Sequence, residues 1–420
     1  MKIASMCAAS ILAFASIAVQ AQTAEETAAA ALEAAPVFDG HNDVPIQLRS
    51  RFDNQINTFS FEDTTATGET HPEGRTMHTD LQRLRTGKVG AQYWSVYVPA
   101  ALDEPEAVVM TLEQIDVTKR LIERYPEDLQ LALTADDVEI ALAQGRIASL
   151  LGMEGGHSIG SSLAVIRQMY DLGARYMTLT HSRNTPWADA ATDTPEHDGL
   201  TDFGRDVIRE MNRIGMQVDL SHVSEKTMHD VLDVAQAPVI FSHSGARAIN
   251  GHARNVPDSV LARLPENGGV VMVVGLPGFL SEEQRQWYAA REAEKKRLET
   301  LWQGQPGEVE AALAEWDEAN ESPVATISDM ADHIDHIRDV AGVAHIGIGG
   351  DYDGMPTGPE GMEDVAGYPA LFTELARRGY SQAELEMISM RNALRALREA
   401  EQYAASQRDS APIETLIAAD

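Results

Sequence analysis

Eight short apolar runs alternate with longer amphipathic segments along this chain, and this alternation constrains the fold more than any other feature. The runs have the length and the β-branched and aromatic content of buried strands. The segments between them, such as SSLAVIRQMYDLGA and DFGRDVIREMNRIG, repeat apolar residues at helical spacing. Eight strand and helix units predict an α/β fold, a (β/α)8 TIM-type barrel, with a doubly wound open sheet as the alternative. The runs are PVFDGHND, AQYWSVYVP, IASLLGMEGG, RYMTLTHS, MQVDLSHVS, PVIFSHS, GVVMVVG and AHIGIGGDYDG.

Two polar stretches interrupt the alternation, residues 49–80 after the first strand and residues 281–320 after the seventh. The first is rich in turn-forming residues, and the second has the pattern of charged helices. Because loops at the carboxyl ends of barrel strands cover the active-site face, we expect both as excursions over that face. Either could form a lid, and a solvated helical hairpin with no role is the alternative for the second. We assign residues 36–400 to one barrel domain with a helical insertion near 281–320. An alanine-rich leader, 22–35, precedes it as a short helix or a loose arm, and a tail, 401–420, follows.

Residues 1–21 have the composition of a cleavable signal peptide, with Lys2 before a small and apolar core and a small-x-small site ending at Ala21. This predicts export, to a periplasm or out of the cell, with an uncleaved interfacial anchor as the alternative. The only cysteine, Cys7, lies inside this segment, so the mature chain would have neither a disulfide nor a thiolate ligand. No membrane anchor is expected, since the last residues, IETLIAAD, are short and charged.

The charge of the chain excludes two classes of partner. The 420 residues include 33 Lys and Arg against 65 Asp and Glu, a formal net charge of −32 at pH 7. Such a chain repels the phosphates of nucleic acids and the anionic surface of a membrane. We therefore expect neither as a partner.

Strong polar residues stand at the ends of the apolar runs. In a barrel the carboxyl ends of all strands converge on one face, so these residues become neighbours although they are far apart in sequence. His41 and Asp43 are two residues apart, a spacing that places both side chains on one face of a strand. The sequence therefore predicts one composite site. Its candidate residues are His41, Asp43, Glu154, His181, His222, His243 and Asp351.

This combination of residue types indicates a metal centre. One histidine at a strand end is more often structural than a ligand, but the group together favours metal binding. Three histidines, an aspartate and a glutamate exceed what one four-coordinate zinc ion needs, whereas two ions sharing a bridging carboxylate would use them all. Zinc is favoured over manganese or cobalt because imidazole and carboxylate both suit it. Two such ions would hold a shared water as hydroxide near neutral pH, which predicts a hydrolase.

Asp351, in GIGGDYDG, is the best candidate for a general acid or base. It follows the last predicted strand, and the nearby glycines let backbone and substrate approach closely. A capping role for Asp351 and competition from Asp353 for the same task remain as alternatives.

Several neighbouring polar residues have ordinary explanations. Asp39 and Asn42 alternate with the ligand pair of the first strand, so we expect them to point outward or to support the ligands from behind. His157 is expected to support the adjacent glutamate. His333 and His336 lie three apart on a predicted helix, and we expect both to be structural and to face solvent.

The assembled motifs resemble the membrane (renal) dipeptidase family, which are binuclear zinc metallo-dipeptidases of the amidohydrolase-like TIM-barrel group. Eight motifs in family order, from residue 38 to about residue 395, carry the resemblance, and eight in order are far more specific than any one. They are FDGHNDVP, GAQYWSVYVP, MEGGHSIG, YMTLTHSRNTPWAD, VDLSHVSEKT, PVIFSHSGAR, RNVPD and IGIGGDYDG.

The resemblance implies a metal-ligand set that agrees with the count above. His41, Asp43 and Glu154 would bind one zinc ion, and Glu154 would bridge to a second ion held by His222 and His243. Each subunit would then carry two Zn²⁺ bridged by Glu154 and a water or hydroxide.

The resemblance also implies roles for three residues that contact substrate. His181, which the ligand count leaves unplaced, would contact the substrate carbonyl and stabilise the tetrahedral oxyanion. Arg254, in HARNVPD, would hold the terminal carboxylate of the substrate, a task suited to a guanidinium group. Asp351 would position the bridging water and pass its proton to the leaving amine.

We therefore expect an exported zinc dipeptidase that acts on dipeptides with a free C-terminal carboxylate and a broad range of side chains. Acceptance of a D-residue at the C-terminal position is left open, and a homodimer is expected from the resemblance alone. VVGLPGFL, after the seventh strand, departs from the polar and aromatic run of many relatives, so the side-chain preference transfers least. The rivals are another amide or lactone hydrolase on the same barrel, and an exported binding protein with an inactive centre.

Overall fold

The computed structural model describes residues 22–70 and 74–417. The predicted signal peptide, its cleavage site and Cys7 lie outside the described residues. The leader forms a helix, α1 (Ala24–Ala34), which begins with a capping box at Thr23 and packs against the C-terminal helices α15 (Tyr368–Arg377) and α16 (Gln382–Glu386).

Eight parallel strands close into a barrel, as the sequence predicted. Neighbouring strands pair in the order β2-β1-β9-β8-β7-β6-β5-β4, and seven residue pairs between β2 and β4, from Ala91↔Ala148 to Tyr97↔Glu154, close the ring. The predicted barrel is therefore confirmed, and an open sheet is excluded. The barrel strands are β1 (Val37–Asn42), β2 (Val89–Tyr97), β4 (Ile147–Glu154), β5 (Ala174–Thr178), β6 (Gln217–Asp219), β7 (Ile240–Ser244), β8 (Val270–Val274) and β9 (Ile346–Gly349).

Every residue of these strands except Tyr97 is buried, which is why most positions of the runs are apolar. Aromatic rings fill part of the barrel: Phe38 stacks on Tyr93, and Tyr93 meets Tyr176 edge to face. Gly152 provides room for this packing, because a Cβ atom there would lie 2.0 Å from the ring of Tyr176.

One strand was not predicted. β3 (Leu129–Leu131) pairs with Ile147–Ser149 at the start of β4, on the side where β5 pairs with the later residues of β4. With three residues, β3 is too short to show a period in the sequence. It lies beside the start of β4, away from the barrel end where the polar residues lie.

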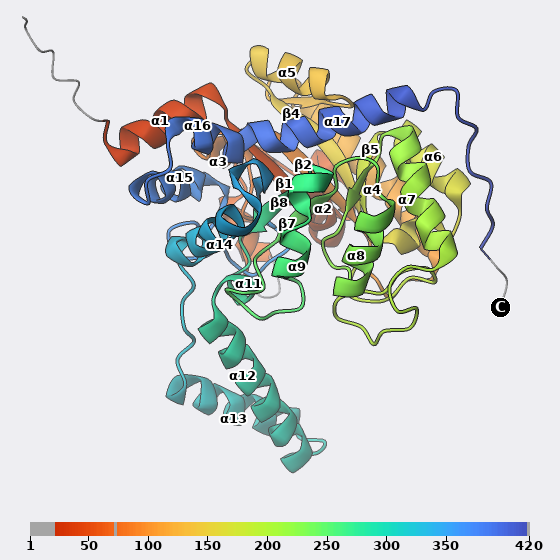
Figure 1. Cartoon of the computed structure of the whole chain (residues 1–420). Helices are drawn as coiled ribbons and strands as arrows, with labels where there is room; N and C mark the ends of the chain where they lie inside the picture. The colour runs from red at the N-terminus through yellow and green to blue at the C-terminus, as the bar shows by residue number, and fades with distance from the viewer. Residues whose placement is uncertain (1–21, 71–73, 418–420) are drawn as a thin grey trace, which may run out of the picture.

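Helices surround the barrel, and Figure 1 shows α17 crossing the end of the molecule opposite the long insertion. α17 continues to Ser406, beyond the end that we predicted for the barrel domain at residue 400. The helices of the layer are α2 (Val44–Phe52), α3 (Leu81–Thr86), α4 (Glu104–Arg124), α5 (Ala135–Ala143), α6 (Leu163–Asp171), α7 (Asp202–Ile214), α8 (Glu225–Val234), α9 (Asp258–Leu261), α10 (Leu264–Asn267), α14 (Ile327–Ala341), α15, α16 and α17 (Asn392–Ser406).

The predicted insertion near 281–320 is a helical hairpin. The short helix α11 (Pro277–Leu280) follows β8 and leads into α12 (Glu282–Leu301) and α13 (Pro306–Ala319). The two long helices are joined by a paired Arg291 and Asp317 and by contact between Trp287 and Trp316. In Figure 1 they project away from the barrel at the bottom of the view.

His333 does not face solvent as predicted. Its side chain, on α14, is fully buried: Nδ1 accepts a hydrogen bond from the backbone N–H of Ala246 at 2.7 Å, and Nε2 donates to the carbonyl of Leu280 at 3.0 Å. Helical spacing alone could not show this, because the partners belong to the loop after β7 and to α11. The neutral imidazole therefore connects two segments that border the barrel mouth.

This burial makes the stability of the fold sensitive to acid. Burial lowers the pKa of His333 to about 4, from an ordinary value near 6.5. Between these values the unfolded chain binds a proton that the folded chain does not. The stabilisation of the fold by neutral His333 is therefore fully present above pH 6.5 and is lost as pH falls towards 4. The loss is about 3 kcal/mol, from roughly 1.4 kcal/mol per pKa unit.

We expect His333→Gln to reduce the difference in unfolding free energy between pH 7.5 and pH 4.5. Urea denaturation with a chelator present measures this without interference from metal binding. An unchanged difference in the variant would show that other groups cause the acid sensitivity.

Candidate metal centre

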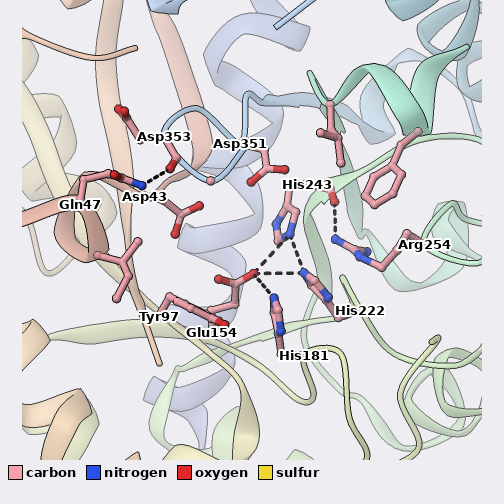
Figure 2. A pocket seen from close by; sticks show the side chains of 14 residues that line it. Asp43, Gln47, Tyr97, Glu154, His181, His222, His243, Arg254, Asp351 and Asp353 are labelled. Atoms are coloured by element: carbon pink, nitrogen blue, oxygen red, sulfur yellow. Dashed lines mark hydrogen bonds and ion pairs between the residues drawn. The ribbon is translucent and has the colours of Figure 1, made fainter. Parts of the chain in front are cut away.

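The predicted ligands lie together at the carboxyl ends of their strands, as Figure 2 shows. Glu154 is the last residue of β4, His243 lies within β7, and His222 follows β6 by three residues. His41 is in β1, and Asp43 stands between the end of β1 and the start of α2. The barrel thus brings residues from four strands into one cluster.

The two carboxylate oxygens of Glu154 face different partners. Oε2 lies 3.5 Å from Nε2 of His41, which is itself 3.3 Å from Oδ2 of Asp43. Oε1 lies 3.1 Å from Nε2 of His222 and 3.4 Å from Nε2 of His243. One carboxylate is therefore shared by two separate sets of ligand atoms, which is the geometry of a bridging ligand.

The residues fit a metal. Two triads whose ligand atoms lie within 4.8 Å of one another share Glu154, namely His41–Asp43–Glu154 and Glu154–His222–His243. Nε2 of His41 is buried and, among the described residues, has no aligned hydrogen-bond partner. A buried nitrogen without such a partner is costly in a protein interior unless it binds a ligand. The centre can therefore hold metal, with imidazole and carboxylate as donors.

The histidines are oriented from behind by hydroxyl groups. Nδ1 of His41 lies 2.8 Å from the hydroxyl of Tyr176, and Nδ1 of His243 lies 2.8 Å from Oγ of Ser242. Ser242 in turn donates to Oδ2 of Asp219 at 2.6 Å. A hydroxyl that donates to a carboxylate accepts from the imidazole, so the proton of His243 sits on Nδ1 and Nε2 is free to bind a metal.

Two fully buried aspartates, neither predicted to have a definite role, hold the backbone of the ligands. Asp39 accepts hydrogen bonds from the N–H groups of His41 and Gly350 and from the hydroxyl of Tyr368. Asp219 does the same for the N–H groups of Ser221 and Ser242. Each aspartate therefore connects its own strand to the next one at the level of the ligands.

Asn42, which we expected to point outward or to act in support, is buried, donates to Thr79 and accepts from the N–H of Val44. The sequence signal for the supporting aspartates was their position two or three residues before a predicted ligand. That signal does not reveal which backbone groups they bind.

The carboxylates of the cluster differ in pKa. Burial raises the pKa of Asp43 and raises that of Asp351 to about 8. Burial would also raise the pKa of Glu154, but His41 and His222 hold it well below its ordinary value. Without a cation, Glu154 is therefore charged while Asp351 carries a proton near neutral pH.

The imidazoles differ in the same way. Burial lowers the pKa of both His222 and His243 well below the ordinary value, so both are neutral and ready to bind metal. Burial opposes charge on His41 too, yet Tyr176 and the adjacent carboxylates raise its pKa well above the ordinary value. A cation at this end of the cluster would replace the proton on His41.

The three predicted substrate contacts lie around the same cavity. Nε2 of His181 is 3.9 Å from Oε1 of Glu154, at the edge of the cluster. Arg254 is buried, with Nη1 3.3 Å from Oγ of Ser244 and Nη2 3.2 Å from the carbonyl of His243. Among the described residues its Nε has no partner.

Asp351 and Asp353 have different contacts, which distinguish their roles. Asp351 forms a possible ligand group with His41 and His243, whereas the Oδ1 of Asp353 accepts a hydrogen bond from the N–H of His78. Figure 2 shows the side chain of Asp351 on the side of the cluster and that of Asp353 turned away. Asp351 is thus the aspartate placed for chemistry.

These groups surround a cavity of about 310 Å³. Its walls include side chains that the sequence did not name as site residues, among them Gln47 from α2, Tyr97 from the end of β2, and Leu276 and Phe279 after β8. Tyr97 could have been found by the same rule as the ligands, because it ends a strand. The other three belong to loops and helices, where no such rule applies.

Residues 25–411 match the protein family described as membrane dipeptidase, peptidase family M19. The chain belongs to this membrane dipeptidase family. The predicted family is confirmed, and the protein is a metallo-dipeptidase with dipeptides as its substrates.

Individual members of the membrane dipeptidase family are similar over most of the chain. Dipeptidase 3 of Rattus norvegicus is 40% identical over 396 residues, which cover 93% of this chain and 70% of that protein. An uncharacterized dipeptidase of Schizosaccharomyces pombe is 41% identical over 373 residues, covering 86% and 80%. A metallo peptidase from Rhodobacter sphaeroides, liganded with a phosphinate mimic of the dipeptide L-Ala-D-Ala, has a TM-score of 0.71 at 25% identity, covering 87% and 99%.

Within residues 22–70 and 74–417 of this membrane dipeptidase, no helix is both long and apolar enough to span a bilayer.

The hydroxyl behind His243 provides a test of the metal centre. We expect Ser242→Ala to weaken metal binding about tenfold or more, the usual effect of removing a group that orients a histidine ligand. Competition with a chromophoric chelator measures the affinity. Ser182→Ala is the control, because its Oγ lies 3.3 Å from Nδ1 of His181, which belongs to neither triad around Glu154. Equal losses in both variants would contradict the proposed orientation.

Proposed function

We propose that this dipeptidase binds two zinc ions and cleaves dipeptides that have a free C-terminal carboxylate. The observation that carries the proposal is the division of the Glu154 carboxylate between His41 on one side and His222 and His243 on the other. His41, Asp43 and Glu154 would hold one ion, and Glu154, His222 and His243 the other. Bound zinc would supply Lewis-acid polarisation of the scissile carbonyl and a water acidic enough to act near neutral pH.

Arg254 is the proposed anchor for the substrate carboxylate. It is buried in the cavity wall, and its Nε has no partner among the described residues. A guanidinium group binds a carboxylate through two parallel hydrogen bonds. An anchor this close to the ligands leaves room for one residue between carboxylate and scissile bond, which explains the restriction to dipeptides.

His181 and Asp351 are the proposed catalytic side chains, on different sides of the cavity. Burial lowers the pKa of His181, so its neutral imidazole can donate one hydrogen bond to the developing oxyanion. Asp351 can hold a proton at its carboxylate and pass it to the departing amine. Its proximity to His41 and His243 places that proton beside the ligands.

The proposal also includes export, a homodimer, a broad side-chain range and acceptance of a D-residue. Export depends on residues 1–21, and a homodimer depends on the family resemblance. A broad side-chain range fits a cavity whose polar groups serve the backbone of the substrate. Acceptance of a D-residue at the C-terminal position is supported by the relative from Rhodobacter sphaeroides, which was liganded with a mimic of L-Ala-D-Ala.

The decisive experiment compares metal-stripped and zinc-restored enzyme on a panel of dipeptides, an N-acyl amino acid and a lactam. We expect two zinc ions per chain and the fastest turnover for dipeptides. Faster turnover of the acyl substrate would favour another amide hydrolase, and two bound ions without any hydrolysis would indicate a binding protein.

Replacement of Arg254 by Met should act mainly on binding. We expect KM for dipeptides to rise about a hundredfold with little change in kcat, because a charge-assisted carboxylate contact contributes about 2–3 kcal/mol. Steady-state kinetics on dipeptides and on their C-terminal amides measure the effect. The amides lack the carboxylate, so the two enzymes should differ little on them; an unchanged KM for the free acids would exclude the anchor.

Replacement of Asp351 by Asn should act mainly on chemistry. The residue has a φ of 63°, a left-handed conformation that asparagine tolerates, so the backbone should be retained. We expect kcat to fall by about 10²–10⁴ because the amide cannot transfer a proton. Zinc content is measured in parallel, and loss of zinc in the variant would mean that Asp351 acts as a ligand instead.

A further inference from the structure

A second cavity, of about 520 Å³, lies next to the catalytic one. Its walls come from α11, from the first turns of α12 and from residues 356–357 after β9. Most of the lining is apolar, including Pro277, Tyr288, Ala289 and Pro356. An apolar hollow with few polar groups is the usual form of a site for an apolar group.

The two cavities adjoin, because Leu276 and Phe279 line both. Phe279 also contacts the proposed carboxylate anchor: the guanidinium carbon of Arg254 lies 5.4 Å from the centre of its ring. The ring of His252 lies tilted against Phe279, with ring centres 4.3 Å apart, and burial together with Arg254 lowers the pKa of His252 to about 4, so this imidazole is neutral. A residue whose carboxylate is bound at Arg254 therefore sits beside the boundary of the apolar cavity.

One polar side chain in the lining of the apolar cavity, Gln284, has a shielded amide oxygen without a partner. Gln284, in the first turn of α12, is 8% exposed, and its Oε1 has no hydrogen-bond partner among the described residues. The other residue of that turn in the lining, Arg285, is paired with Glu282. An unpaired amide oxygen is costly, and a turn of the Gln284 side chain toward the cavity would let a ligand complete its hydrogen bonds.

We propose that the cavity of Leu276, Phe279, Gln284, Tyr288 and Ala289 binds the C-terminal side chain of the dipeptide and prefers an aromatic side chain with a polar tip, such as tyrosine. The apolar walls accept the ring, and the amide of Gln284 completes a hydrogen bond to the phenol. A phenol both donates and accepts, so it matches the amide in either orientation. This inference rests on the proposed function, because Arg254 is what places the C-terminal residue here.

The N-terminal side chain is the competing occupant. The contact between Phe279 and Arg254 favours the C-terminal residue, because that residue alone carries the carboxylate. Ala-Ala, Ala-Phe, Ala-Tyr and Tyr-Ala separate the two positions, and the readout is kcat/KM relative to Ala-Ala for each enzyme.

The test uses full-length zinc-loaded enzyme and three variants. Ala289→Trp fills the cavity from an exposed position, and Ala290→Trp, one residue further along and outside the lining, is its matched control. Gln284→Leu keeps the size of the side chain and removes its polarity. We expect the wild type to prefer Ala-Tyr over Ala-Ala about tenfold or more, as is typical for a side chain that fills a pocket.

We expect Ala289→Trp to abolish this preference and Ala290→Trp to retain it. Gln284→Leu should lower the ratio of Ala-Tyr to Ala-Phe about tenfold, the effect of one hydrogen bond. Loss of preference for Tyr-Ala instead of Ala-Tyr, or equal ratios in all four enzymes, would overturn the proposal. Failure to hydrolyse Ala-Ala at all would instead count against the proposed function.

Discussion

One buried carboxylate, that of Glu154, is shared between His41 on one side and His222 and His243 on the other, and the rest of this structure depends on this arrangement. Glu154, His41, His222 and His243 occupy a volume in which Nε2 of His222 and Nε2 of His243 are only 3.0 Å apart. Groups of this kind lose their hydration when buried, and they repay that cost only through close partners of the right charge. A cation between them would satisfy this requirement, so the arrangement is built for metal binding more than for stability of the metal-free fold.

The barrel meets this constraint with its backbone. Parallel strands deliver the ligands to one end, and Asp39 and Asp219 bind N–H groups on adjacent strands, which holds the strand ends at a fixed separation. His222 and Asp351 have φ values of 70° and 63°, which residues other than glycine rarely adopt. Each costs of order 1 kcal/mol, which the surrounding hydrogen bonds must offset.

One buried histidine connects the two segments that carry Arg254 and Phe279 beside the catalytic cavity. His333 joins the loop after β7, which carries Arg254, to α11, which carries Phe279. The proposed carboxylate anchor and the boundary shared by the two cavities are therefore positioned by one buried imidazole. VVGLPGFL, for which we expected the least transferable side-chain preference, supplies the Leu276 and Phe279 shared by both cavities, so substrate preference can vary without disturbing the candidate ligands.

The sequence by itself determined the barrel and the candidate ligands, because each ligand follows an apolar run and the carboxyl ends of parallel strands must converge. The candidate metal ligands were predicted in the same way, whereas the substrate-contact roles of His181 and Arg254 were implied only by the family resemblance. Only the tertiary structure decided that His333 is buried, that β3 exists, and that Gln284 lines an apolar cavity with its amide oxygen unpaired. These features depend on contacts between segments far apart in the chain. A local pattern of residues does not show which distant segment will pack against it.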